Sequence, residues 1–103
     1  MNISVTELYE KTQQDPQLAW IDVRTYVEFN DQRPESSSVK NLPLDQLSDI
    51  EAPKDQPLYI SCLSGKRSQA AQQILKASGY AHVVNVIGGF NAWKAAGLPV
   101  NKT

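Results

Sequence analysis

The chain is poor in several features, and each shortage excludes a class of protein. It has 103 residues and no apolar run of 18 or more, so no membrane-spanning helix is predicted. The N-terminus has no basic segment followed by an apolar one, and we therefore expect no signal peptide. Cys62 is the only cysteine, which excludes an internal disulfide and favours the cytoplasm, where a free thiol stays reduced.

Metal ligands and cofactor motifs are equally scarce. His82 is the only histidine and no cluster of carboxylates accompanies it, so no metal site is predicted. The pair Gly88-Gly89 lacks the further glycine and the distant acidic residue of a dinucleotide-binding loop. A tight turn from a strand into a helix accounts for this pair better. We expect neither a metal ion nor an organic cofactor.

Acidic residues are missing from the second half of the chain. All eleven lie between Glu7 and Asp55, and with five basic residues they give the first part a net charge of −6. From Gln56 onward the chain has five basic residues and no carboxylate, a charge of +5. These five are Lys66, Arg67, Lys76, Lys94 and Lys102. They are scattered and no recognition motif accompanies them, so a nucleic-acid partner is not expected.

The remaining composition, 41% hydrophobic and 20% charged, is that of a small globular protein. We expect one domain, residues 1–103, in which strands alternate with helices. Helices are predicted from the capping box Ser4-Val-Thr-Glu7 to a stop before Asp15, and at 25–30, 67–78 and 90–96. Strands are predicted at 18–21, 39–42, 57–61 and 82–87, with a polar loop at 30–38, a turn or helix opening at Pro43, and a connector at 50–57. Because the strands are continuously apolar, an α/β fold with a parallel sheet and helices on both faces is predicted.

Two polar side chains directly follow predicted strands. Ligands bind such sheets at the carboxyl ends of the strands, so Asp22 and Cys62 are expected to face one crevice. A helix follows Cys62, and its unpaired N–H groups and positive dipole end favour an anion and lower a thiol pKa. The predicted anion-binding loop consists of Leu63, Ser64, Gly65, Lys66, Arg67 and Ser68. Its glycine permits a tight turn in which successive amides converge on one point.

Cys62 has two interpretations. A reactive thiol requires that the side chain is exposed and its pKa lowered, whereas an inert cysteine is a small buried apolar residue. The setting Cys-x-x-Gly-x-Arg-Ser between a strand and a helix favours the reactive thiol. Two nearby cations, Lys66 and Arg67, could steer and hold a dianion.

Two chemistries use such a loop. A cysteine phosphatase places five residues between its cysteine and arginine and commonly uses an aspartate as general acid. Here four residues separate Cys62 from Arg67, and this smaller loop suits a sulfur atom bound to the thiol better than a phosphoryl group. A sulfane-sulfur transferase needs only the thiolate and stabilising amides, and without a second cysteine the sulfur acceptor must be external. An arsenate reductase, or a module that carries a persulfide or binds a protein partner, is a further alternative.

Three motifs resemble those of the rhodanese-like sulfurtransferases along nearly the whole chain. They are Trp20-Ile-Asp-Val-Arg24 with Glu28-Phe29, Tyr59-Ile-Ser-Cys-Leu-Ser-Gly-Lys-Arg-Ser68, and Gly88-Gly-Phe-Asn-Ala-Trp93 with Gly97-Leu-Pro99. The resemblance implies a five-stranded parallel α/β sheet and a persulfide on Cys62. It also implies transfer of sulfur from a small anionic donor, thiosulfate or a persulfide, to a thiophilic acceptor such as cyanide, a thiol or a protein.

One segment departs from the family pattern. Asn41-Leu-Pro-Leu44 is kept, but Pro34-Glu-Ser-Ser-Ser-Val39 replaces the usual glycine- and histidine-containing run before it.

The first motif supplies two supporting residues. Asp22 either orients the crevice or hydrogen-bonds the loop after Cys62, or else it is a helix cap or a partner for Arg24. Arg24 either helps to bind an anion or forms an ion pair within the fold.

Overall fold

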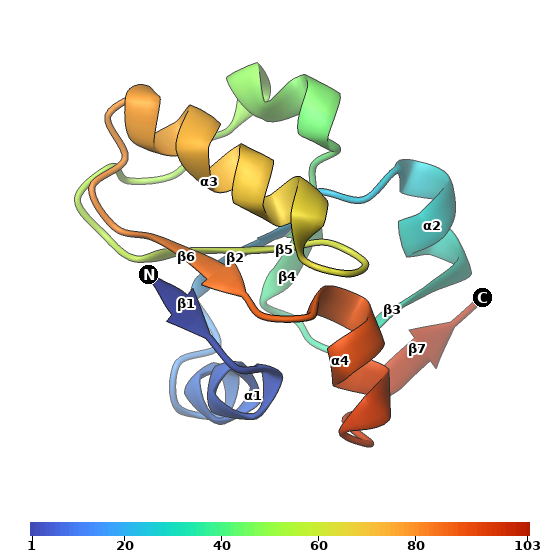
Figure 1. The fold of residues 1–103 in the computed structure, drawn as a ribbon. Helices are drawn as coiled ribbons and strands as arrows, with labels where there is room; N and C mark the ends of the chain where they lie inside the picture. The colour runs from blue at the N-terminus through green and yellow to red at the C-terminus, as the bar shows by residue number, and fades with distance from the viewer.

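A five-stranded parallel sheet forms the centre of the computed structural model, which describes residues 1–103 (Figure 1). The strand order is β1-β6-β5-β2-β4. The strands are β1 (Asn2–Ile3), β2 (Ala19–Asp22), β4 (Val39–Asn41), β5 (Leu58–Ser61) and β6 (Val83–Val86). The predicted α/β fold with a parallel sheet is confirmed. The central strand β5 and its neighbour β6 are buried along their whole length, as their continuous apolar runs indicated.

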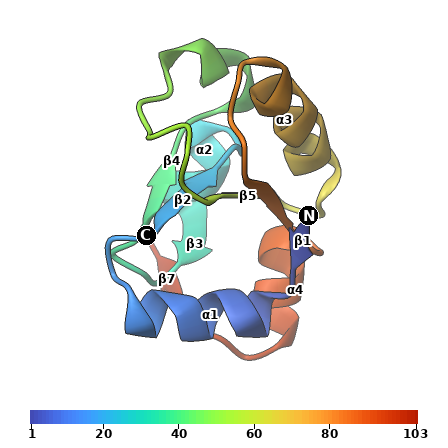
Figure 2. The same cartoon turned by 90° about the vertical axis from the view of Figure 1, so that its left-hand side faces the viewer.

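Helices cover both faces of the sheet (Figures 1 and 2). They are α1 (Val5–Gln14), α2 (Tyr26–Asp31), the 3₁₀ helix η1 (Leu44–Asp49), α3 (Lys66–Ala77) and α4 (Gly89–Ala95). α1 and α4 lie on one face, where Trp20 and Tyr59 join their apolar core. α3 and η1 lie on the other, where Ile60 and Leu75 belong to a second core. Alternate residues of each strand therefore serve opposite layers. None of these helices has the length and apolarity to cross a membrane.

The helix boundaries follow the predicted capping residues. Ser4 caps α1 by accepting a hydrogen bond from the Glu7 amide at 3.2 Å. Thr25 and Glu28 form a reciprocal capping box at the start of α2. After α3 the chain turns at Gly79, where a φ of +98° suits glycine. These ends place each helix within one or two residues of its predicted range.

Three short strands were not predicted. β1 has two residues, too few for a periodic pattern, and it becomes the fifth strand by pairing with β6. β3 (Gln32–Pro34) pairs in antiparallel fashion with β7 (Val100–Lys102), so the expectation of a loop over 30–38 is wrong for these residues. The polar composition and the proline hid this ribbon, because its pairing depends on a partner almost 70 residues away.

The carboxyl ends of the central strands meet at one edge of the sheet. Asp22 lies beside Ser61 on β5 and Asn41 on β4 in the parallel register. Cys62 comes immediately after Ser61, and the Val23 amide donates to the Ser61 carbonyl at 2.8 Å. The fold therefore brings Asp22 and Cys62 to the same edge, as the sequence predicted.

Candidate active site

The loop between β5 and α3 folds back over the sulfur of Cys62. Gly65 adopts a φ of +103°, a left-handed conformation that strains any residue with a Cβ. This turn aims the Gly65 amide at Cys62, and the N–H donates to Sγ at 3.0 Å. Lys66 then begins α3, so the sulfur lies at the N-terminal end of a twelve-residue helix. Figure 1 shows this loop beside the start of α4.

The turn at Gly88-Gly89 packs against the start of the same loop. The amide of Phe90 donates to the Cys62 carbonyl at 2.8 Å, and the Asn91 amide donates to the Leu63 carbonyl at 3.0 Å. A Cβ on Gly89 would collide with the carbonyl group of Cys62. The pair is thus the tight strand-to-helix turn that the sequence predicted, and Gly89 also permits a close backbone approach that the sequence did not reveal.

Cys62 is completely buried, with 0% of its surface exposed, so the expectation that this side chain is exposed is wrong. Its pKa is nevertheless lowered, as expected for a reactive thiol. Burial acts in the opposite direction and raises the pKa, but hydrogen bonds outweigh it. For the thiolate form the donors are the hydroxyl of Ser68 and the amides of Ser68, Gly65 and Ser64. In the structure the protonated thiol itself donates to Ser68 Oγ. A buried thiol in a cradle of donors differs from the inert buried cysteine that was the alternative.

Ser68 connects the sulfur to a buried asparagine. Its Oγ lies 3.5 Å from Cys62 Sγ, 3.0 Å from the Gly65 carbonyl and 2.5 Å from Oδ1 of Asn85. Both Ser68 and Asn85 are buried. Ser68 was among the predicted loop residues. Asn85 was not predicted, although a lone polar residue within the apolar strand Val83–Val86 was a signal.

The two cations of the loop have different surroundings. Arg67 forms a bidentate ion pair with Glu28 of α2, with N···O distances of 2.7 and 2.9 Å. The Arg67 hydrogen bonds lower the pKa of Glu28 to about 2, and Glu28 raises that of Arg67. Lys66 is exposed and has no carboxylate partner. Lys66 is thus the cation of the loop that is free to meet an anion from solution.

Asp22 and Arg24 form a buried ion pair beneath the site. Arg24 Nη2 lies 2.9 Å from Asp22 Oδ2, and Nε donates to both carboxylate oxygens. The guanidinium carbon also lies 4.5 Å from the ring centroid of Phe90 and 5.7 Å from that of Phe29. The Asp22 carboxylate makes no hydrogen bond to the loop of residues 63–68. The pair joins the end of β2 to α2 and α4, which supports the structural interpretation of both residues.

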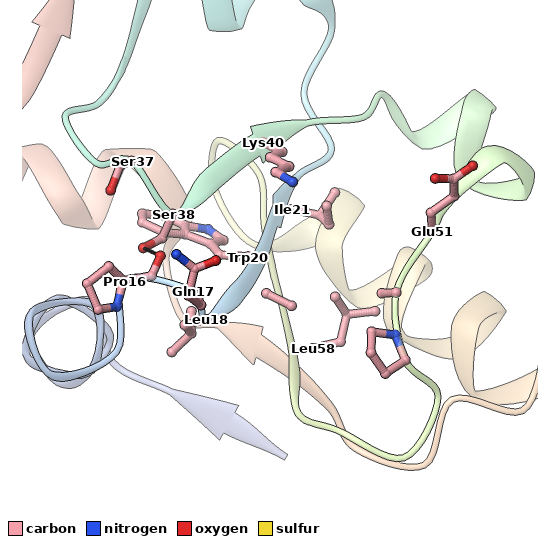
Figure 3. A pocket seen from close by; sticks show the side chains of 13 residues that line it. Pro16, Gln17, Leu18, Trp20, Ile21, Ser37, Ser38, Lys40, Glu51 and Leu58 are labelled. Carbon is pink, nitrogen blue, oxygen red and sulfur yellow. Dashed lines mark hydrogen bonds between the residues drawn. The ribbon is translucent and has the colours of Figure 1, made fainter.

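A cavity of about 250 Å³ lies at the opposite edge of the sheet, where β2 and β5 begin (Figure 3). Pro16, Ser38, Lys40 and Leu58 are among its lining residues. Ser38 belongs to the segment that departs from the family pattern, and its hydroxyl donates to the Pro16 carbonyl at 3.0 Å. Ser37 and Ser38 of this segment therefore border the cavity, and Cys62 is not among its lining residues.

The fold is therefore that of an α/β protein with a parallel sheet and a hydrogen-bonded thiol directly after its central strand. The chain belongs to the rhodanese-like domain family, which it matches over residues 4–96. This membership confirms the resemblance found in the three sequence motifs.

The chain is similar to several sulfurtransferases and to solved structures. Thiosulfate sulfurtransferase 18 of Arabidopsis thaliana is 34% identical over 97 residues, covering 80% of this chain and 71% of that protein. Thiosulfate sulfurtransferase GlpE of Haemophilus influenzae is 30% identical over 101 residues, covering 85% and 92%. A rhodanese-like domain protein from Staphylococcus aureus superimposes with a TM-score of 0.81 at 31% identity, covering 99% of this chain and all of that one.

Proposed function

We propose that this protein is a sulfurtransferase that works through a persulfide on Cys62. The thiolate attacks the outer sulfur of thiosulfate or of a persulfide donor, forming a new S–S bond. The S–S bond of the donor breaks, and its electron pair leaves with sulfite or with the donor thiolate. An acceptor nucleophile then attacks the outer sulfur of the Cys62 persulfide, and Cys62 departs as a thiolate.

The lowered pKa of Cys62 is the observation that carries this proposal. Sulfur chemistry of this kind requires a thiolate, and the hydrogen-bond donors around Sγ favour the charged form. The same amides of residues 63–68 would stabilise the anionic outer sulfur of the persulfide. Lys66 would attract a small anionic donor from solution, while Arg67, held by Glu28, adds a fixed positive charge.

The acceptor is external to the chain. With one cysteine, the protein has no second thiol that could take the sulfur from Cys62. Cyanide, a low-molecular-weight thiol or the thiol of a protein would serve, and delivery to one dedicated protein would make the same persulfide a carrier. A cysteine that must be kept as a free thiol supports a cytoplasmic location.

Phosphatase or arsenate reductase activity fits the site less well. The loop from Cys62 to Arg67 is one residue shorter than a phosphatase loop, and Arg67 is directed toward Glu28 by two hydrogen bonds. A phosphoryl group needs an arginine that is free to bind its oxygens in a bidentate manner. The ion pair therefore argues against a phosphate-binding role for Arg67.

Replacement of Cys62 by serine tests the proposal. We expect Cys62→Ser to abolish thiocyanate formation from thiosulfate and cyanide, because a serine hydroxyl is not ionised at neutral pH. Circular dichroism and urea unfolding should show that the variant is folded. Sulfur transfer that survives in the folded variant would refute the assignment, and Cys62-dependent hydrolysis of an aryl phosphate would favour the phosphatase instead.

A further inference from the structure

Asn85 is a polar residue in an otherwise apolar strand. It lies in β6 between Val84 and Val86, only 3% exposed, and is paired with Ile60 of the central strand β5. Val83, two residues earlier on the same face, packs in the core beneath α3. Asn85 therefore extends toward α3, on the side of the sheet where Cys62 lies. A buried amide at such a position requires polar partners.

Its partner is the hydroxyl of Ser68, which has one proton and three acceptors within reach. Those acceptors are Asn85 Oδ1 at 2.5 Å, the Gly65 carbonyl at 3.0 Å and Cys62 Sγ at 3.5 Å. In the structure the carboxamide oxygen faces Ser68, so the hydroxyl can donate to Asn85 while the Cys62 thiol donates to Ser68. This chain of donors satisfies the protonated sulfur.

When Cys62 loses its proton to a base in solution, its sulfur changes from a hydrogen-bond donor to an acceptor. The thiolate has no proton to donate and needs donors, and the Ser68 hydroxyl can supply one only by turning away from Asn85. If Asn85 Oδ1 still faced Ser68 Oγ, these two oxygens would then have no proton between them. A carboxamide resolves this, because rotation about its terminal bond exchanges an acceptor for a donor of similar shape.

We propose that Asn85 is a positioning residue that directs the Ser68 hydroxyl. Its carboxamide accepts from Ser68 while Cys62 is a thiol, and turns to donate to Ser68 Oγ once Cys62 is a thiolate. The inference rests on the proposed function for the importance of the thiolate, but it concerns the ionisation of Cys62 alone. It can therefore be tested without any sulfur-transfer assay.

Other charged groups near Cys62 bear on its ionisation and stay constant in the test. They are Asp22 and Arg24 after β2, Glu28 on α2, Lys66 and Arg67 on α3, and Lys94 on α4, whose ammonium lies 5.0 Å from the ring centroid of Phe90. β6 has no titratable residue. A neutral variant at Asn85 therefore leaves all of these charges in place and removes the hydrogen bond to Ser68.

The direct test is the pH dependence of Cys62 alkylation by iodoacetamide in the wild type and in Asn85→Leu. Leucine has a similar size and neither donates nor accepts. Loss of one donor from the thiolate network should move the rate profile to higher pH and slow alkylation roughly three- to tenfold below the thiol pKa. If Asn85 only holds the hydroxyl away from the sulfur, Asn85→Leu should move the profile to lower pH or not at all, and this would overturn the proposal.

Two controls separate positioning from general damage. In a Ser68→Ala background, Asn85→Leu should leave the profile unchanged, because Asn85 acts through Ser68. Val83→Ala, on the same face of β6 but outside the network, should lower the urea midpoint without moving the profile. A full effect of Asn85→Leu in the Ser68→Ala background would contradict the inferred relay.

A measurement on the wild type covers the case in which Asn85→Leu does not fold. The side-chain amide resonances of Asn85, assigned by NMR, should shift with pH through the same midpoint as the alkylation rate. In Ser68→Ala this titration should be lost or reduced severalfold. Wild-type resonances that do not respond to Cys62 ionisation would overturn the proposal. These measurements do not involve a persulfide. A failure of this inference can therefore be distinguished from a failure of the proposed sulfurtransferase function, which the Cys62→Ser assay tests.

Discussion

At the scale of the residue, the surroundings of Cys62 illustrate how hydrogen bonds can outweigh burial. A thiol without solvent contact ordinarily holds its proton more tightly, yet four donors around Sγ lower the pKa. Since these donors come mainly from backbone amides, most of the site depends on the shape of the loop. The sequence predicted this loop through Gly65 and the following helix. It could not predict the complete burial of the sulfur, which lies under the folded-back loop and in the core with Ala71 and Leu75 of α3.

The Glu28–Arg67 pair gives a pH-dependent contribution to stability that can be measured. Pairing lowers the pKa of Glu28 from 4.5 to about 2, so the contribution is fully present above about pH 4.5. It is lost as the pH falls toward 2, because the folded protein then takes up the proton. Glu28→Gln should therefore be less stable than the wild type at pH 7, by on the order of 1 kcal/mol for a pair whose side chains are 35% and 30% exposed.

The comparison is made by urea unfolding of the wild type and Glu28→Gln between pH 2 and pH 7. The difference between them should shrink below pH 4.5 and vanish near pH 2. Asp45→Asn, at an exposed carboxylate with no ion-pair partner, is the control. A difference that stays constant over the whole range would show that Glu28 stabilises the fold by something other than its charge.

At the scale of the element, the turn between β6 and α4 contacts the start of the loop that follows Cys62. Gly89 and Gly97 both have positive φ, at +55° and +72°, but only Gly89 lies against other atoms. A Cβ at Gly97 would meet nothing within 4 Å, whereas at Gly89 it would collide with the Cys62 carbonyl. The two glycines thus form a matched pair that separates backbone strain from contact with the loop.

Alanine at these positions should give different results. Gly97→Ala should cost roughly 1 kcal/mol from the left-handed backbone alone and leave the Cys62 alkylation profile unchanged. Gly89→Ala should cost about 2 kcal/mol or more and slow both alkylation and sulfur transfer, because the loop must shift. Urea unfolding and iodoacetamide kinetics measure both effects. Equal behaviour of the two variants would show that the close approach of Gly89 has no influence on the site.

Most elements were predictable from the sequence, including the three-residue strand β4, but β1 and the β3–β7 ribbon were not. β5 and α3 carry clear apolar patterns and bounded ends, and both occur within one or two residues of the predicted ranges. β1 and the β3–β7 ribbon have two or three residues each and form through distant partners. Asn85 was not predicted for a similar reason. Its hydrogen bond with Ser68 forms only because α3 packs on β6.

At the scale of the whole molecule, charge is divided between the two parts of the chain. The loop of residues 63–68 belongs to the part of the chain without carboxylates, and its Lys66 is exposed. A positive surface raises the local concentration of an anionic donor, and salt screens this attraction. The rate constant kcat/KM for thiosulfate should therefore fall as ionic strength rises.

Lys66→Gln tests this contribution. The variant should raise the KM for thiosulfate severalfold at low ionic strength with little change in kcat, and the difference should diminish in high salt. Lys76→Gln, in the last turn of the same helix, removes the same charge far from the sulfur and is the control. Equal effects of the two variants would show that overall charge matters and that Lys66 has no local role.

Intact mass spectrometry after exposure to thiosulfate shows whether Cys62 carries the transferred sulfur. We expect that the reduced wild type gains the mass of one sulfur atom and that cyanide or a thiol removes it. Cys62→Ser should gain nothing. A wild type that remains unmodified with thiosulfate and also with glutathione persulfide would contradict this expectation, as would an equal gain in the serine variant.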